Sequence, residues 1–147
     1  EISCSLVGSE MCIRDRNILA DFRKRGIPVA VINEHLQGDL VKFYGVHGTD
    51  FFYWFYPSPC SHSKFGLEKI NGIAKGTPFS VEELKIQSDK AAEALNVPIY
   101  GGDCVISADG TLRIIDFNDW PSFARCREEA GGKIAECIYK RAKKQMK

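Results

Sequence analysis

The stretch YGGDCVISADGTLRIIDFNDWPSF (residues 100–123) contains two apolar runs on either side of the pair Asp109-Gly110. Asp-Gly is a preferred pair for the centre of a type I′ turn, so the stretch predicts a β-hairpin with a two-residue turn. We expect its strands at 99–107 and 111–118. The second strand begins as a buried apolar run and then turns acidic, which requires an explanation because ionised carboxylates are rarely buried alone.

Three oxygen-bearing side chains converge in this hairpin. Pairing centred on the Asp-Gly turn makes Asp103 and Asp116 direct cross-strand neighbours, and Asn118 points to the same face two residues later. Two carboxylates about 5 Å apart repel by roughly 3 kcal/mol at an effective dielectric of about 20. A favourable cross-strand pair contributes only about 0.2–1 kcal/mol. A proton or a cation is therefore expected between the two aspartates.

The donor chemistry favours Mg²⁺ or Mn²⁺ over zinc, because all three ligands are oxygens. Magnesium held by one or two carboxylates usually completes its shell with phosphate oxygens and water, which implies a bound nucleotide. The alternative is a pairing shifted by one residue. A longer turn would separate Asp103 from Asp116 on a solvated edge.

The rest of the chain predicts alternating helices and strands of the α+β class, with a mixed or antiparallel sheet and flanking helices. Residues up to Gly26 read as the end of an amphipathic helix, and VAVI (29–32) as a short buried strand. DLVKFYGV (39–46) and DFFYWFYP (50–57) form a predicted hairpin around HGT. Both faces of its second strand are apolar, which indicates core packing, with a nucleotide-stacking platform or a partner surface as the alternative.

Residues 57–79 read as a long loop, and the segment after it as a helix. Ser80 and Glu83 form a capping box at its start, and Asn96 ends it before Pro98. A last helix is expected at roughly 122–145, weakened by two adjacent glycines.

Bulk composition excludes several classes of protein. The chain has 147 residues and a formal net charge of +1, with charges of both signs interspersed, which predicts one domain and no nucleic-acid partner. The longest apolar run is too short to span a bilayer. Six cysteines include no C-x-x-C pair, a usage that suits a reducing cytoplasm. Cys104, Cys126 and Cys137 are expected to be core thiols.

The N-terminal segment SLVGSEMCIRDR (5–16) resembles the in-frame translation of a sequencing-library transposase adapter, and residues 6–15 match it without a difference. We expect residues 1–16 to be adapter-derived, with a real N-terminal segment as the alternative. Residues 17–147 are then expected to be the C-terminal part of a longer natural domain.

The hairpin at 100–123 resembles the last hairpin of the ATP-grasp superfamily. That family carries an acidic residue on one strand and Asp or Glu, any residue, and Asn on the next, and these positions bind the magnesium ions of Mg-ATP. Asp103, Asp116 and Asn118 occupy them. The resemblance implies that residues 17–147 form the C-terminal portion of an ATP-grasp fold, close to glutathione-synthetase-like ligases and inositol-polyphosphate kinases.

The segment VINEHLQGDLVKFYGV (31–46) resembles the strand, hinge and strand of the same family. The resemblance implies that the hinge meets the adenine of ATP, largely through backbone groups. Asp39 becomes a candidate for the ribose hydroxyls, and Lys42 matches a basic position that faces phosphates or substrate. Glu34 and Asp39 could instead be exposed turn residues, and Lys42 a solvated strand lysine. The matching hinge residues are Asn33, Glu34, His35 and Leu36.

Family analogy implies an enzyme that uses Mg-ATP to activate a carboxylate as an acyl phosphate, which an amine, ammonia or a thiol then attacks. Arg125 and Arg127 are candidates for an anionic small-molecule substrate, with helix-surface ion pairing as the alternative. Two other functions stay open: a small-molecule kinase of the same fold, and a nucleotide-binding module without turnover. The phosphate-gripping lysines and the substrate domain of the family have no match before Asn17, so the chain alone is expected to be inactive.

Overall fold

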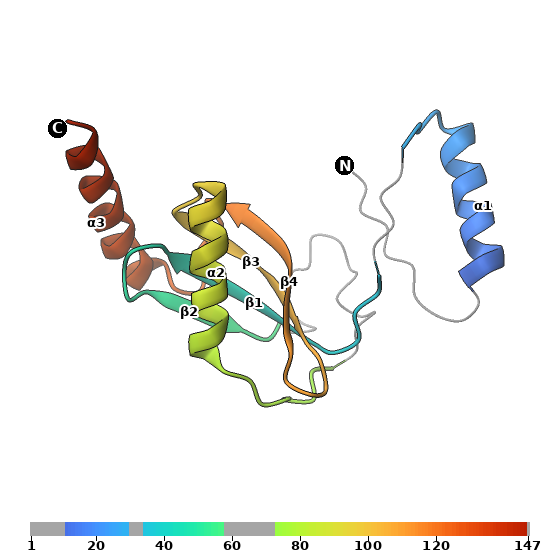
Figure 1. Cartoon of the computed structure of the whole chain (residues 1–147), viewed down its shortest axis with the longest axis horizontal. Coiled ribbons are helices and arrows are strands. Elements are labelled where there is room, and N and C mark those ends of the chain that lie inside the picture. Colours follow the sequence, from blue (N-terminus) through green and yellow to red (C-terminus); the bar gives the residue numbers. More distant parts are fainter. Residues whose placement is uncertain (1–10, 30–33, 58–72, 147) are drawn as a thin grey trace. The chain divides into compact units, whose positions relative to one another are not determined.

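A computed structural model of the chain describes residues 11–29, 34–57 and 73–146. The chain divides into two compact units, residues 1–36 and residues 37–147. The first unit contains helix α1 (Met11–Lys24), and the second contains all strands and the other two helices (Figure 1).

Helix α1 confirms the predicted helix that ends before Gly26. Its last turn carries Arg23 and Lys24, which complement the helix dipole, and Gly26 follows with a φ of 71°. The helix also includes positions 11–16, so its backbone continues through the expected boundary at Asn17. Most of the predicted strand at 29–32 lies outside the described residues, and Val29, which is described, is exposed outside any strand.

The second unit is a four-stranded antiparallel sheet with helices against it, which confirms the α+β class. Its strands are β1 (Asp39–Val46), β2 (Phe52–Phe55), β3 (Ile99–Ile106) and β4 (Leu112–Asp119), and their order across the sheet is β2-β1-β3-β4. Each of the predicted hairpins is present, and β1 and β3 meet at the centre.

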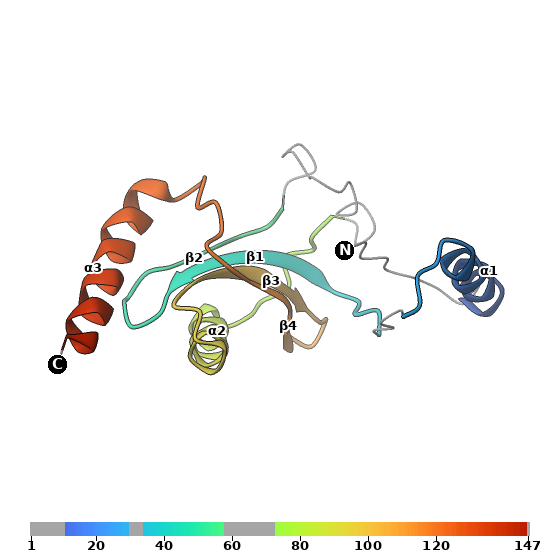
Figure 2. The same cartoon turned by 90° about the horizontal axis from the view of Figure 1, so that it is seen from above.

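One face of the sheet is covered by helix α2 (Val81–Leu95), as Figure 2 shows. The predicted helix ends are confirmed: the Ser80 hydroxyl accepts a hydrogen bond from the Glu83 N–H at 3.1 Å, and Asn96 adopts a left-handed conformation with a φ of 55°. The core under α2 is built from apolar side chains of the helix and of the central strands, among them Val41, Phe43, Leu84, Ala92, Tyr100, Cys104 and Ile106.

Tyr100 is the largest side chain in this core, and Gly45 makes room for it. A Cβ atom on Gly45 would lie 2.3 Å from the Tyr100 ring, so only glycine fits opposite this tyrosine. The Tyr100 hydroxyl donates to Asp89 at 2.8 Å, and Asp89 also pairs with Lys85 at 2.6 Å. Burial and the Asp89 carboxylate raise the pKa of Tyr100 far above its ordinary value, which keeps the phenol protonated.

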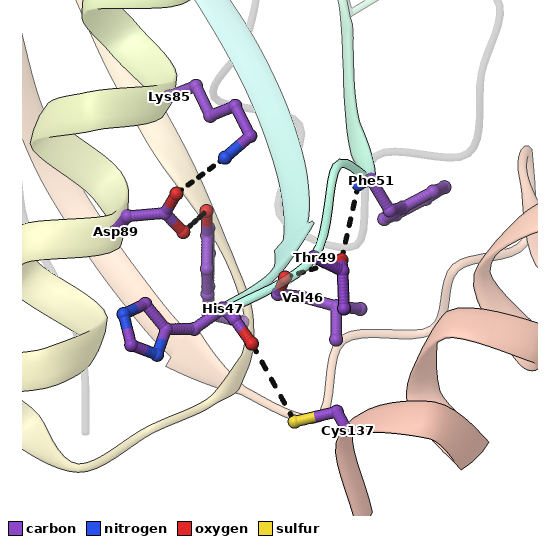
Figure 3. Close-up of polar contacts among 8 residues, drawn as sticks. Val46, His47, Thr49, Phe51, Lys85, Asp89 and Cys137 are labelled. Carbon is purple, nitrogen blue, oxygen red and sulfur yellow. Dashed lines mark hydrogen bonds and ion pairs between the residues drawn. The ribbon is translucent and has the colours of Figure 1, made fainter. Parts of the chain in front are cut away.

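A second apolar cluster joins helix α3 (Arg127–Gln145) to the β1–β2 hairpin. Val46 and Phe51 of the hairpin pack with Ala130 and Cys137 of the helix. The turn is held by Thr49, whose hydroxyl donates to the Val46 carbonyl at 2.7 Å and accepts from the Phe51 N–H at 3.2 Å (Figure 3). Helix α3 starts at Arg127, later than the predicted position near 122, because Trp120 and Phe123 have positive φ angles.

The predicted type I′ turn between β3 and β4 is wrong. Ser107 and Thr111 close a three-residue loop, in which the Gly110 N–H donates to Ser107 and Gly110 takes a φ of 82°. A type I′ turn needs positive φ at both central residues, and Asp109 does not have it. The side-chain oxygen of Asp109 instead accepts from the Thr111 N–H at 3.0 Å.

The three predicted core thiols, Cys104, Cys126 and Cys137, are buried and free. Among the helices that the structure describes, none combines the length and the apolar character needed to cross a bilayer.

Candidate functional site

The candidate site is a row of side chains on the face of the sheet opposite α2. Val41 and Phe43 point into the core under α2, so Lys42 between them points to the other face. In the strand pairing Lys42 lies opposite Asp103, and Asp103 lies opposite Asp116. The row therefore crosses three neighbouring strands, β1, β3 and β4.

The predicted pairing of Asp103 with Asp116 is confirmed, although the turn that was expected to set it is wrong. The three-residue loop shifts the pairing by one residue, so that Cys104 lies opposite Ile114. An irregularity between Asp103 and Cys104 then restores the predicted register, with Ile115 as the extra residue. This bulge keeps Asp116 on the face away from the core.

Asp103 already has a cation beside it. The Lys42 ammonium lies 3.1 Å from each of the two carboxylate oxygens of Asp103. The two side chains are 28% and 22% exposed, so this ion pair is more shielded from water than an ordinary surface pair. Part of the repulsion between the aspartates is thus offset by a lysine of the chain itself.

Asp116 has a neutral hydrogen-bond partner in place of a cation. Its side chain is exposed, and one carboxylate oxygen accepts a hydrogen bond from the Asn118 amide at 2.6 Å. Asn118 shares the face of Asp116, as the alternation of β4 predicts. The hydrogen bond from the Asn118 side chain orients the carboxylate and adds no charge. The row of Lys42, Asp103 and Asp116 therefore carries one net negative charge when all three side chains are ionised.

The donor set fits magnesium or manganese better than zinc, because all its donors are oxygens. No group of three or more His, Cys, Asp or Glu side chains in the described part of the chain could hold a metal ion. The row supplies two carboxylates, with an amide as the third oxygen donor. That set is too small for an all-protein cage and fits an ion that takes its remaining ligands from phosphate and water.

Asp39, the candidate for the ribose, is buried at the start of β1 with 5% exposure. Its two oxygens accept hydrogen bonds from the N–H groups of Lys75 and Thr77, each at 2.8 Å. Burial raises the pKa of Asp39, and these hydrogen bonds outweigh it, so that the pKa lies below its ordinary value. The carboxylate thus ties the end of the long loop to β1, a structural role that its sequence position did not reveal.

The predicted hinge residues belong to the first unit, whereas the other site residues belong to the second. Asn33 lies outside the described residues. Glu34 is exposed, and His35 and Leu36 are half-buried, all three outside helices and strands.

Arg125 and Arg127 lie between β4 and the first turn of α3. The Arg125 guanidinium stacks on Phe55, 4.3 Å from the ring centroid, and Phe55 is the β2 partner of Lys42. Arg125 therefore precedes the helix and packs on an aromatic ring, which differs from helix-surface ion pairing. A hollow of about 480 Å³ beside it is lined by Tyr53, Ala124, Arg125, Cys126, Arg127, Glu128 and Glu129.

The aromatic side chains of β2 pack on both faces of the sheet, as core packing predicts. On the face that carries the polar row, Tyr44 lies 5.3 Å from Phe123 and 5.7 Å from Phe55 between ring centroids. Pro121 and Tyr44 both cover Gly101, where a Cβ atom would lie 2.7 Å from Tyr44. The segment after β4 thus covers the sheet beside the row, two residues away from Lys42 on β1 and from Asp103 on β3.

Comparisons of the chain with family models, with curated proteins and with solved structures found no match.

Proposed function

We propose that this chain is the Mg-ATP-binding part of an ATP-grasp enzyme, with Asp103, Asp116 and Asn118 as the ligands of Mg²⁺ or Mn²⁺. The observation that supports the proposal is the direct pairing of Asp103 with Asp116 on a sheet face that α2 leaves uncovered. Neutral or apolar residues would serve a structural strand better, since two facing carboxylates repel.

The proposed reaction is the ATP-dependent joining of a carboxylate to an amine or a thiol. The carboxylate of the substrate takes the γ-phosphoryl group, and the nucleophile then displaces phosphate from the acyl phosphate. Bound magnesium supplies positive charge to the phosphoryl group in transfer. Asp103, Asp116 and Asn118 orient that charge. Arg125 and Arg127 are the proposed contacts of an anionic small-molecule substrate.

Two alternatives share the same ligands. A small-molecule kinase would transfer the phosphoryl group to a hydroxyl, and a non-catalytic module would bind the nucleotide without turnover. We also propose a cytoplasmic location, which the three buried free thiols support.

The decisive test is the loss of magnesium-dependent ATP binding in Asp116→Asn. This substitution keeps the shape of the side chain and removes its charge, so we expect the affinity for Mg-ATP to fall at least about ten-fold, the effect of losing 1.4 kcal/mol. Calorimetry with and without Mg²⁺ measures the change. The matched control is Asp119→Asn, an exposed aspartate at the end of the same strand.

If Asp116→Asn and Asp119→Asn lose equal affinity for Mg-ATP, the loss comes from the change in net charge and not from a metal ligand. Unchanged binding in Asp116→Asn would refute the proposed metal site. The substrate class is then tested separately, by phosphate release from ATP with candidate carboxylates and alcohols on the natural full-length protein.

A further inference from the structure

The ion pair between Lys42 and Asp103 occupies the oxygens that the proposed metal needs. The ammonium lies 3.1 Å from both oxygens of Asp103, so it sits symmetrically in front of the carboxylate. A divalent ion that bound Asp103 through these oxygens would meet a positive charge at contact distance. The two cations compete for one carboxylate.

We propose that Lys42 is a built-in counter-ion that holds the acidic pair together without metal and leaves Asp103 when a divalent cation binds. This inference rests on the proposed function and adds a regulatory step to the same site.

The strand register supports this role. Lys42, Asp103 and Asp116 are consecutive partners across β1, β3 and β4, so the lysine lies on the side of Asp103 away from Asp116. Backbone pairing fixes the positions of the two aspartates on the sheet, so the ion pair can open by a movement of the lysine side chain alone. A lysine carries its charge on a flexible four-carbon stem, which allows the ammonium to move while the backbone stays in place.

The surroundings of Lys42 include a second cation. Its β2 partner is Phe55, whose ring is already stacked with Arg125. A lysine that leaves Asp103 therefore remains on a sheet face next to a second cation, where phosphate groups of a nucleotide would be attracted. Metal and triphosphate would then assist each other's binding, because each stabilises the state in which Lys42 has left Asp103.

The test is the affinity of the 147-residue chain for Mn²⁺ alone, measured by the paramagnetic resonance of the free ion. Lys42→Met removes the competing charge and keeps the length of the side chain. We expect it to bind Mn²⁺ about ten-fold more tightly than the wild type, within the range typical of coupled sites. Lys140→Met on α3 is the control: it removes the same charge from an exposed ion pair with Glu136, and its affinity should equal that of the wild type.

A second measurement needs only the folded wild type. The ¹⁵Nζ resonance of Lys42, assigned by its absence in Lys42→Met, should shift when Mg²⁺ is added, while the resonance of Lys140 stays in place. If Lys42→Met destroys the fold, Lys42→Arg, which keeps the positive charge beside Asp103, supplies the assignment by the loss of the same resonance.

The outcomes separate the two proposals. If the wild type binds Mg-ATP but Lys42→Met gains no affinity for Mn²⁺ and the Lys42 resonance does not shift, the counter-ion role is overturned. The proposed metal site is then still supported. Absence of metal binding in every variant, with and without ATP, overturns the proposed function and the counter-ion role with it. A gain in Lys42→Met and in Lys140→Met alike shows a general charge effect and also overturns the counter-ion role.

Discussion

Two serines of α2 illustrate how one residue type stabilises or destabilises a helix according to its position. The Ser80 hydroxyl caps the helix by accepting from the Glu83 N–H, whereas Ser88 is fully buried against the sheet. The Ser88 hydroxyl has no hydrogen-bond partner among the described residues. The local pattern identified the cap from sequence. It did not identify the buried hydroxyl, because burial of Ser88 depends on which helix face meets the sheet.

We expect Ser88→Ala to raise the free energy of unfolding by about 1 kcal/mol, because it removes a buried hydroxyl whose desolvation is not compensated. Ser80→Ala should lower it by about 1 kcal/mol through loss of the cap. Urea denaturation of both variants measures the difference. A destabilised Ser88→Ala protein would show that a water or a residue outside the described ranges bonds this hydroxyl.

Strand β4 shows at the scale of an element why the pairing of Asp103 with Asp116 was predicted correctly from a wrong turn. The alternation of apolar and polar residues and the Asp-Gly pair were enough to predict the hairpin and the pairing of Asp103 with Asp116. They were not enough to predict the three-residue loop, whose offset is cancelled by the bulge at Ile115. Two irregularities of opposite effect leave the register at the site unchanged. The bulge does have a signature in the sequence, since the core-facing residues change from even positions, Leu112 and Ile114, to the odd position of Phe117.

Deletion of Ile115 should therefore be tolerated, although it shortens a strand. Removing the extra residue gives a regular ladder in which Ile114 still faces Cys104 and Asp116 still faces Asp103. We expect a loss of stability below about 1.5 kcal/mol, since Ile115 is 52% exposed, and retention of metal binding.

Deletion of Phe117 is the comparison. It turns Asn118 toward the core and removes a ring that stacks on Tyr100 at 5.1 Å, so it should cost more than about 3 kcal/mol. Chemical denaturation of both deletions gives the two values. Unfolding of the Ile115 deletion would mean that the bulge itself stabilises the sheet.

At the scale of the whole molecule, the contacts of Lys42 and of Asp39 join distant segments, and the sequence did not predict them. Lys42 and Asp103 are 61 residues apart, and Asp39 reaches residues 36 and 38 positions further along the chain. The hairpins β1–β2 and β3–β4 follow from local patterns, whereas the pairing of β1 with β3 brings separate hairpins together. That pairing created the lysine–aspartate pair, so no local pattern could show that a lysine of the chain itself lies beside Asp103.

The contacts of Asp39 with the N–H groups of Lys75 and Thr77 can be tested through their dependence on pH. Its folded-state pKa is lowered, because the N–H groups of Lys75 and Thr77 outweigh the effect of burial. A group with a lowered folded-state pKa stabilises the fold above its unfolded value of about 3.9, and the contribution is lost as the pH falls through the folded-state pKa. Asp39→Asn should thus lower the free energy of unfolding by about 2 kcal/mol at pH 7, and the gap to the wild type should close below about pH 4.

Denaturation curves of the wild type and of Asp39→Asn between pH 7 and pH 3 measure this gap. Asp21→Asn is the control, because that exposed aspartate of α1 forms only a surface ion pair at 3.6 Å with Arg25. A gap that stays constant with pH would mean that the shape of the Asp39 side chain, and not its charge, anchors the loop. The role of Asp39 at the ribose is separable from this anchoring, since it predicts tighter binding of ATP than of a nucleotide without ribose hydroxyls only while the carboxylate is present.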